Sequence, residues 1–484
     1  MIDYRKICVF AFIIFAMHSN TFAYTHVHPT PTIPDSIDLY STTDVFTINL
    51  ITQLHRKLFK SHNNSVVPDV VERFDVSSDG MNYKFILKKL KFHNGKVLTS
   101  YDVKHSLESL IKNHAVGHEK LKYIFGYKDY IDLITKDLVG IQILSENSFI
   151  IRLVRPVPNL LSYLTDFRLS ITNRLANHSV GLGDYKLNKI SQDEIELLLV
   201  ADSKKNIPSK IYYQKSDFNN AIALFQNGEY HDLFSYPVDS KVVNSLPSNI
   251  NSQKIYTPRT YLFVINSRRI DELEQRQAIS NIISKNKLIN SCYEGNDETV
   301  SLIPPGFFGY ISKLNSKNGS NVEYVKDRLK ISVSKGVNNE KCVSEYIVSV
   351  FSRLGIQADV IIEDITSIMK KWENNSLDMY FAYFETDNTL DIFQVFHPES
   401  NFKIINTVNK GLVSMIESYN LITDPIEKQR KASMISNKIL DLHVVLPLFH
   451  PEQYLVYDNK YSLLNLNYTS PTFIKFNKLE KREY

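Results

Sequence analysis

Three residues near the start of the chain could bind a transition metal if the chain is cut just before them. Tyr24-Thr25-His26 would then combine a free α-amine, two backbone amides and a third-position imidazole. Such a set suits the square-planar geometry that Cu(II) and Ni(II) adopt with nitrogen ligands, and His28 is near enough in sequence to assist. The alternative is a frayed terminus whose histidines bind nothing, because chain ends are usually poorly ordered.

A second histidine pair, His114 and His118, would lie one turn apart on a helix. Gly117 between them disfavours a helix, and no third ligand follows nearby. Enzyme motifs are missing as well: the sequence has no G-x-S-x-G, H-E-x-x-H or C-x-x-C pattern and no glycine-rich phosphate loop. The sequence therefore predicts a protein that is not an enzyme, with no metal and no cofactor. An exported hydrolase with an unrecognised nucleophile is the competing class.

The first 23 residues have the pattern of a secretory signal peptide. A basic start (Arg5, Lys6) precedes an eleven-residue apolar run, 7–17, and small residues occupy the −3 and −1 positions of a cleavage site after Ala23. The run is much shorter than the ~20 apolar residues that span a bilayer. The sequence therefore predicts export of a soluble mature protein.

Removal of this segment leaves two cysteines, Cys292 and Cys342. They could pair in an oxidising compartment, or remain two separate buried thiols. The sequence does not give their separation in space, so both possibilities stay open.

The bulk composition indicates an ordinary folded protein of several domains. A chain of 484 residues exceeds one hydrophobic core and suggests two or three domains. Its 43% hydrophobic and 22% charged residues are typical of globular proteins. The net charge of +4 comes from interspersed acids and bases, so there is no electrostatic footprint for nucleic-acid binding.

The segment from Pro68 to Leu110 predicts a β-hairpin followed at once by an amphipathic helix. Asp79-Gly80 supplies a turn between two alternating strands. Thr99-Ser100-Tyr101-Asp102 has the spacing of a capping box. The helix after it would bury apolar residues at i, i+4, i+7 and i+8, namely Val103, Leu107, Leu110 and Ile111.

This segment also resembles the signature of bacterial extracellular solute-binding proteins of the oligopeptide, dipeptide and nickel type. The matching positions are Pro68, Phe74, Ser77, Asp79-Gly80, Tyr83, Phe85, Leu87-Lys88, Phe92-His93-Asn94-Gly95, Leu98-Thr99, Asp102-Val103 and Ser106-Leu107. Further matches lie at Gly181–Leu187, Tyr261–Asn266, Arg276–Ile279, Ser301–Gly306 and Val444–Phe449. The resemblance thus runs from about residue 40 to residue 470, with departures at His55–Leu58 and in the short polar stretch 311–328.

The resemblance implies an α/β, two-lobed periplasmic-binding-protein-like fold with an additional third α/β domain, of the class II, peptide-binding type. Lobe I would be discontinuous, the hairpin–helix segment would belong to the extra domain, and lobe II would close over the ligand by a hinge. The expected limits are 1–23 for the signal peptide, 24–47 with 163–262 and 456–484 for lobe I, 48–162 for the extra domain, and 263–455 for lobe II.

The resemblance further implies the function of a periplasmic substrate-binding component of an ABC importer. The protein, a monomer, would capture di- or oligopeptides in an interlobe cleft and deliver them to a membrane permease and its ATPase. Two alternatives remain on the same fold. One is a binder of a nickel chelate, haem or another non-peptide solute, and the other is a non-transporting chaperone or regulatory protein.

The ligand residues are expected around an aromatic and acidic run near residue 380. In the resembled family, an aspartate after an aromatic-rich strand takes the peptide α-ammonium, and Asp387 is the best candidate, with Glu385 and Asp391 as rivals. A charged acceptor suits a desolvated ammonium, although Asp387 could instead cap a turn.

Three aromatic residues of the same run, Tyr380, Tyr383 and Phe384, could line ligand pockets. Since strand residues alternate between faces, at least one of the three should be core. A carboxylate-binding arginine would complete peptide capture, and the sequence does not choose among Arg259, Arg268, Arg269 and Arg353.

Overall fold

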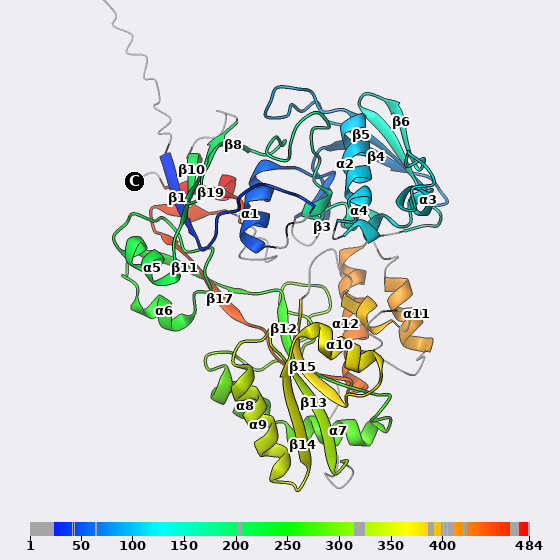
Figure 1. Cartoon of the computed structure of the whole chain (residues 1–484), viewed down its shortest axis with the longest axis vertical. Coiled ribbons are helices and arrows are strands. Elements are labelled where there is room, and N and C mark those ends of the chain that lie inside the picture. Colours follow the sequence, from blue (N-terminus) through cyan, green and yellow to red (C-terminus); the bar gives the residue numbers. More distant parts are fainter. Residues whose placement is uncertain are drawn as a thin grey trace, which may run out of the picture.

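The computed structural model describes residues 24–482 apart from gaps at 41, 43, 63–64, 116, 158, 201–205, 314–324, 386–391, 398–399, 401–403, 405–409, 420–421, 423 and 465–473. The chain forms three units, which we call lobe I, the extra domain and lobe II. Lobe I and the extra domain lie side by side above lobe II (Figure 1). None of the described helices is both long and apolar enough to span a bilayer.

Lobe I is built on a four-stranded sheet in the order β1-β10-β9-β8, in which only β1 and β10 are parallel. Its strands and helices are β1 (Tyr24–Thr30), α1 (Val45–Leu54), β8 (Tyr185–Ile190), β9 (Glu194–Leu199), β10 (Pro208–Lys215), α5 (Phe218–Gln226), α6 (Ser240–Ser245), β18 (Tyr461–Leu463), η6 (Phe476–Lys478) and β19 (Leu479–Lys481). One core joins the first and last parts of the chain, because Tyr24 packs in the same cluster as Phe476 and Leu479.

The extra domain has its own sheet, β4-β5-β7-β6, with every neighbouring pair antiparallel. Its elements are β2 (Phe59–His62), β3 (Ser65–Pro68), β4 (Val71–Val76), β5 (Asn82–Leu87), α2 (Ser100–Lys112), η1 (His118–Leu121), α3 (Tyr127–Ile131), β6 (Ile141–Ser145), β7 (Ser148–Arg152), α4 (Leu160–Tyr163) and η2 (Phe167–Leu169). Its core extends from Leu58 to Leu182.

The predicted hairpin and helix of this domain are confirmed. Gly80 has φ +68° in the turn between β4 and β5, a left-handed conformation that favours glycine. Helix α2 begins after Thr99, whose backbone N–H and hydroxyl both donate to the Asp102 carboxylate, at 3.0 and 2.6 Å. The four apolar residues predicted to face the core, from Val103 to Ile111, are fully buried.

Gly181 and Gly183 are required for a reason that the sequence did not indicate. Neither has a positive φ; instead both lie against the end of α1, where an added Cβ would come within 1.9 Å of the Leu54 carbonyl oxygen and 2.0 Å of the Gln53 carbonyl oxygen. His93 bridges them, since its Nδ1 accepts from the Gly181 N–H at 3.2 Å and its Nε2 lies 3.1 Å from the Gly183 carbonyl. His93 therefore has a structural role.

Lobe II contains a mixed five-stranded sheet in the order β14-β13-β15-β12-β16, with a hydrophobic core on each face. Strands β13, β14 and β15 are parallel, while β12 is antiparallel to β15 and β16. The elements are β12 (Arg259–Ile265), α7 (Leu273–Ile282), α8 (Lys285–Cys292), β13 (Arg328–Ser334), α9 (Glu340–Ser352), β14 (Gln357–Glu363), α10 (Ile365–Glu373), β15 (Met379–Glu385), η4 (Ile392–Phe396), α11 (Lys410–Tyr419), α12 (Pro425–Asp441) and β16 (Val445–Phe449).

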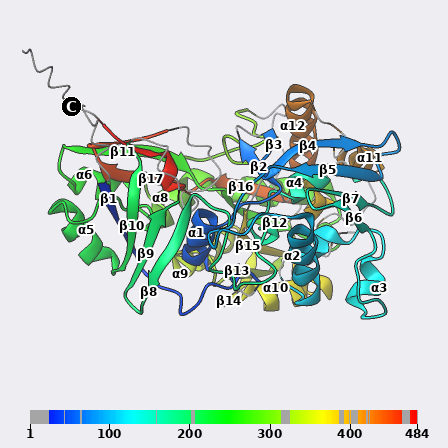
Figure 2. The same cartoon turned by 90° about the horizontal axis from the view of Figure 1, so that it is seen from above.

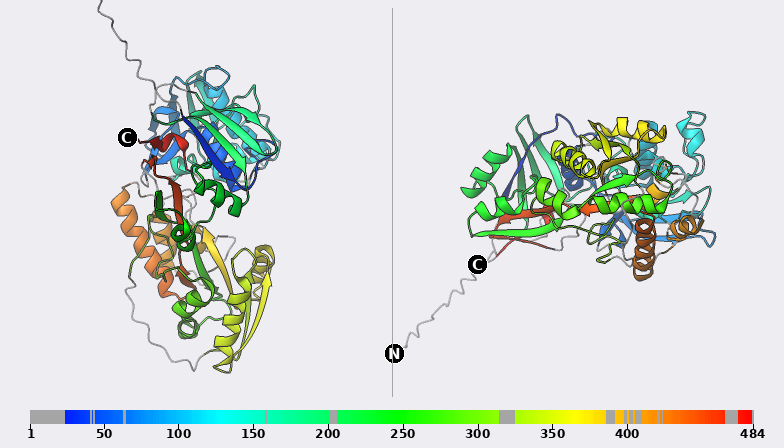
Figure 3. Two further views of the ribbon diagram at one scale, coloured as in Figure 1. Left: turned by 90° about the vertical axis from the view of Figure 1, so that its left-hand side faces the viewer. Right: turned by 90° about the horizontal axis from the view of Figure 1, so that it is seen from below.

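Two antiparallel strands, β11 (Ile250–Tyr256) and β17 (Glu452–Asp458), join lobe I to lobe II. Strand β11 leads directly into β12, and β16 leads directly into β17. Both strands contribute to the lobe I core, and side views show them running toward lobe II (Figure 3). The chain thus passes between lobes just before Arg259 and just after Phe449, so residues 261–266 follow the crossing.

The hydrophobic cores group two segments differently from the expected domain limits. Leu50 and Leu54 place α1 in the core of lobe I, although the expected limit assigned residues from 48 onward to the extra domain. Seen from above, α1 lies between the lobe I sheet and the extra domain (Figure 2). Conversely, Leu164 and Leu182 pack in the extra domain.

A disulfide joins Cys292, at the end of α8, to Cys342 in α9, with the two Cα atoms 5.7 Å apart. Of the two possibilities that the sequence left open, the structure therefore contains the bonded pair. It connects two helices that pack on the same face of the lobe II sheet.

Candidate functional site

Three parallel strands of lobe II end at the edge of the sheet that faces lobe I. Their last residues are Ser334 in β13, Glu363 in β14 and Glu385 in β15. Arg259 lies at the same edge, because β12 enters the sheet there from lobe I and pairs with Glu385. Open α/β sheets bind ligands at the carboxyl ends of their strands. We call this region, centred on Arg259, Tyr383 and Glu385, the lobe II edge.

Arg259 links the two predicted ligand residues that close β15. Its Nε lies 3.6 Å from Glu385 Oε2, and its guanidinium carbon lies 4.8 Å from the centroid of the Tyr383 ring. Both charged side chains are substantially exposed, at 40% and 51%, so the ion pair adds at most about 1 kcal/mol to stability. The cation–π contact instead keeps the guanidinium over a flat aromatic surface that is open to solvent.

A group of packed aromatic rings supports this surface from below. The Tyr261 ring lies 5.7 Å from that of Tyr383 and 4.7 Å from that of Phe449, and Tyr293 lies 4.7 Å from Phe449. Burial raises the pKa of Tyr261 above its usual value, although the charge of Arg259 opposes the shift. The phenol therefore stays neutral at physiological pH, and the base of the edge is rigid and apolar.

His450 fixes the loop beside the edge. Its Nδ1 lies 3.0 Å from the Thr260 hydroxyl and its Nε2 lies 3.1 Å from the Thr299 hydroxyl. Burial lowers the pKa of His450 to about 4, so the ring is neutral at pH 7 and one nitrogen can accept while the other donates. The loop after α8 is thus held against the first residues of β12.

The predicted aromatic ligand residues divide between the edge and the core. Tyr383 and Phe384 are half-buried at the end of β15, where they pack against opposite faces of the sheet. Tyr380 is 1% exposed and its ring lies 4.9 Å from that of Trp372, in an edge-to-face contact. Tyr380 therefore packs in the core, which agrees with the expectation that at least one of the three would do so.

Asp387 and Asp391 lie outside the described residues, which end at Glu385 on this strand. Among the three acidic candidates, only Glu385 can be placed, and it is paired with Arg259.

The four candidate arginines separate clearly. Arg268 donates to backbone carbonyls in lobe II, and Arg269 forms a 2.7 Å ion pair with the buried carboxylate of Asp378. Arg353 follows the end of α9 and is exposed. Only Arg259 lies at the lobe II edge, because it alone begins a strand that enters from lobe I. No local sequence pattern around Arg259 indicated that it would lie at the lobe II edge.

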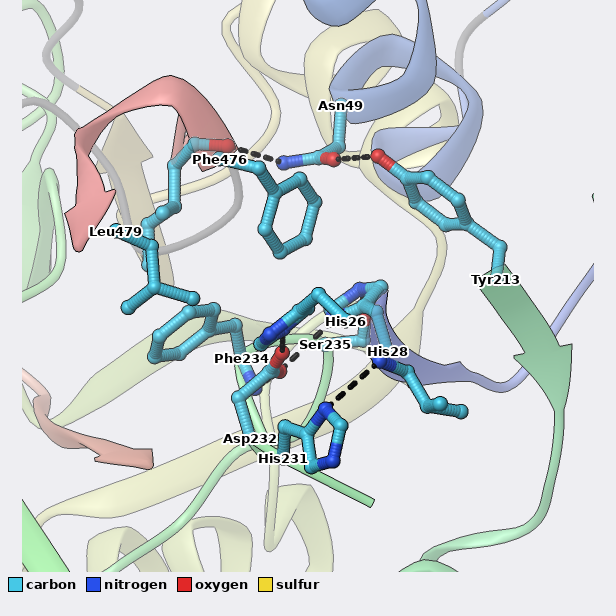
Figure 4. Close-up of polar contacts among 12 residues, drawn as sticks. His26, His28, Asn49, Tyr213, His231, Asp232, Phe234, Ser235, Phe476 and Leu479 are labelled. Carbon is cyan, nitrogen blue, oxygen red and sulfur yellow. Dashed lines mark hydrogen bonds and ion pairs between the residues drawn. The ribbon is translucent and has the colours of Figure 1, made fainter. Parts of the chain in front are cut away.

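The histidines near the start of the chain belong to a buried network and not to a terminal metal site (Figure 4). Residues Tyr24–Thr30 form β1, in which His26 and His28 are at most 2% exposed. His26 Nε2 lies 2.6 Å from one oxygen of Asp232, and His28 Nδ1 lies 2.7 Å from the other. An N-terminal Cu(II) or Ni(II) set needs the His26 ring to turn back toward its own backbone, whereas here it points to Asp232.

This network, the His26–Asp232–His28 cluster, ties β1 to the loop between α5 and α6. Burial raises the pKa of Asp232, but the two imidazoles outweigh burial and hold it well below its usual value. The carboxylate therefore remains ionised, and it also accepts from the Phe234 N–H at 2.8 Å. Burial lowers the pKa of His26. The cluster thus holds two distant segments together. Because His26 and Asp232 are 206 residues apart, no local sequence pattern predicted the contact.

The two histidines of the other pair, His114 and His118, do not lie on one helix. His114 and Gly117 have φ values of +45° and +95°, which end the helical conformation, and His118 Nδ1 lies 2.6 Å from the Tyr127 hydroxyl. Within the described part of the chain, no three His, Cys, Asp or Glu side chains are arranged to hold a metal ion.

Comparison with known proteins agrees with this architecture. A Brucella ovis protein described as an ABC transporter peptide-binding protein is 25% identical over 256 residues, which cover 48% of this chain and 45% of that protein. The dipeptide-binding protein of Escherichia coli is 21% identical over 364 residues, or 65% of this chain and 66% of the relative. The chain therefore matches about half of the first relative's length and somewhat under two thirds of the second.

The fold itself is shared more completely. The unliganded open form of the periplasmic murein tripeptide binding protein MppA superposes with a TM-score of 0.78 at 13% identity, over 95% of this chain and 98% of that one. The profile of the bacterial extracellular solute-binding proteins, family 5, matches residues 65–398. Because that match spans well over half of this chain, the chain belongs to the bacterial extracellular solute-binding proteins, family 5.

Proposed function

We propose that this protein is the periplasmic substrate-binding component of an ABC importer for peptides. A peptide would lie extended between lobe I and lobe II, the lobes would close around it, and the loaded protein would deliver it to a permease. Hinge closure of this kind needs only a few residues that change conformation between rigid lobes, and the short passages near 257–258 and 450–451 would be those residues. The protein would act by binding and not by catalysis.

The lobe II edge is the observation that carries the proposal. It presents Tyr383, the Arg259 guanidinium and the last described residue of β15, Glu385, toward lobe I. A peptide carries an ammonium at one end and a carboxylate at the other. Asp387 would take the ammonium, Arg259 would turn from Glu385 to the carboxylate or a backbone carbonyl, and Tyr383 and Phe384 would line side-chain pockets. Tyr380 would contribute only by packing beneath them.

Native mass spectrometry of the protein as purified from cells tests the peptide class. We expect a spread of co-purified masses that fragment as peptides. A single fixed mass or a metal adduct would contradict the proposal and favour a non-peptide solute.

The role of Asp387 can be tested with a matched pair of ligands, using one co-purified peptide and its N-acetylated form. A charge-assisted hydrogen bond contributes roughly 1.5–3 kcal/mol, so Asp387→Asn should weaken binding of the free-amine peptide about tenfold or more. The N-acetylated peptide should bind both proteins equally weakly. Asp271→Asn, at an exposed position at the start of the lobe II helices, is the control and should change neither affinity.

Equal loss of both peptides in the Asp387→Asn variant would show that the carboxylate acts on the fold and not on the ammonium. Calorimetry with each peptide gives the four affinities that the comparison needs.

A further inference from the structure

Several basic side chains lie where the end of α1, the extra domain and the C-terminal segment meet. Most are already neutralised. The buried carboxylate of Asp166 pairs with Lys120 and, at 3.2 Å, with Arg168. Asp184 pairs with Arg56 at 2.7 Å. Two of the carboxylates at this junction are therefore fully engaged.

Two lysines of the junction, Lys57 and Lys475, are held in place by their backbones. Lys57 follows the end of α1, and its N–H donates to Asp69 Oδ2 at 3.3 Å. The residues on either side of Lys475 both bond to the side chain of Gln53 in α1, at 2.9 and 3.3 Å. The two side chains therefore start from fixed points around the same helix end.

Neither ammonium group has a hydrogen-bond or ion-pair partner among the residues that the structure describes. Both lysines are half-buried, and Asp69 is a carboxylate that acts on each of them. Burial, followed by the charge of Lys475, lowers the pKa of Lys57 to about 8. Burial also lowers the pKa of Lys475, while Asp69 and Asp184 oppose the shift. The site thus holds two partly desolvated cations. Asp69 acts on both, Asp166 also acts on Lys57, and Asp184 also acts on Lys475. Asp166 and Asp184 are each already paired with another cation.

We propose that Lys57 and Lys475 form an anion-binding site that takes a carboxylate or phosphate group. Partly buried charges are costly unless they are paired, and an anionic oxygen group between two ammonium groups would supply charge-assisted hydrogen bonds to both. Lysine serves as a point-charge ligand for phosphate in other proteins. Neither lysine is among the residues assigned to the lobe II edge, so a variant of the lysines and a variant of the edge test the two proposals separately.

The first experiment uses inorganic phosphate and acetate as probes. Thermal unfolding of the whole protein is followed as each probe replaces chloride at constant ionic strength. At least one probe should raise the transition temperature of the wild type, because an anion that binds only the folded state stabilises it. The Lys57→Met/Lys475→Met variant should bind that probe about tenfold or more weakly. Lys89→Met, at an exposed lysine of the extra domain, should respond like the wild type.

The proposal is overturned if the wild type responds to neither probe, or if the double variant responds as strongly as the wild type. In either case the neighbouring carboxylates would balance the two lysines.

A second experiment reads the site without relying on the double variant. Lysines are reductively methylated with ¹³C, and the Lys57 signal is assigned by its loss in Lys57→Met. We expect it to titrate near pH 8 in chloride and at a higher pH with the bound anion, because a negative charge favours the protonated amine. An unchanged titration contradicts the proposal. Native mass spectrometry then distinguishes the sources: an acidic co-purified mass absent from the double variant identifies a captured solute, whereas its absence from both identifies a free ion.

Discussion

At the scale of single residues, the His26–Asp232–His28 cluster stabilises the fold, although its residue types are those of a catalytic or metal-binding site. A carboxylate between two imidazoles suggests catalysis or metal binding, yet all three side chains are at most 2% exposed. Each ring nitrogen that faces Asp232 is bonded to it at 2.6 or 2.7 Å. Burial on this scale leaves no space for a substrate.

Replacing Asp232 by Asn should strongly destabilise the protein. Removing one partner from a buried charged network typically costs about 3–5 kcal/mol, and an amide cannot accept from both imidazoles with the same strength. Urea unfolding followed by fluorescence measures the change. Glu229→Gln, at an exposed position three residues away, is the control and should shift the free energy of unfolding by less than about 0.5 kcal/mol. A loss below 1 kcal/mol in Asp232→Asn would show that the cluster contributes little.

At the scale of elements, local sequence patterns predicted local structure well. The turn at Asp79-Gly80 and the capping box at Thr99 and Asp102 both formed as expected, because each depends on residues a few positions apart. Strand alternation also predicted that at least one of Tyr380, Tyr383 and Phe384 would be core, without indicating which, and Tyr380 is.

Features that join distant segments were not predictable in the same way. Arg259 reaches Tyr383 only because β12 pairs with β15, and Lys475 approaches Lys57 only because the C-terminal segment returns to α1. Gly181 and Gly183 could be recognised as important, but their close approach to α1 depends on tertiary packing. The expected role of Asp387 stays a prediction, since that residue lies outside the described chain.

The disulfide between α8 and α9 should contribute substantially to the stability of lobe II. It spans 50 residues, for which the loss of chain entropy in the unfolded state corresponds to about 4 kcal/mol. The double variant Cys292→Ser/Cys342→Ser should therefore unfold at lower urea concentration than the oxidised wild type. Wild type treated with reductant should shift by a similar amount, whereas the double variant should be insensitive to reductant. Equal midpoints for all of them would contradict this expectation.

At the scale of the whole molecule, buried histidines in different units should make the protein sensitive to acid. Burial lowers the pKa of His55, His231 and His450 to about 4 in each case, whereas histidine in an unfolded chain titrates near 6.5. Below pH ~6.5 the unfolded state binds protons that the folded state does not. Stability is therefore complete above that pH and falls as the pH drops toward 4.

Each of the three histidines should remove about 1.4 kcal/mol from the free energy of unfolding between neutral pH and pH 5.5. Urea unfolding at several pH values between 7.5 and 4.5 measures the total. His450→Gln keeps much of the hydrogen bonding without a titrating ring, so its stability should decline less steeply with acid than that of the wild type. A parallel decline of both proteins would exclude His450 as a contributor.

The lobe I core combines the first and last described parts of the chain, and this affects the order in which the three units fold. In its first strand, the Tyr24 hydroxyl donates to the Leu479 carbonyl, and Asn49 in α1 donates to the Ile474 carbonyl. The extra domain and lobe II are formed from residues that lie between these ends. During synthesis or export from the N-terminus, those two units can fold early, while lobe I must wait for the final residues of the chain. The lobe that begins the sequence is therefore the last to become stable, and a chain interrupted near its end would retain two folded units without the partner against which lobe II would close.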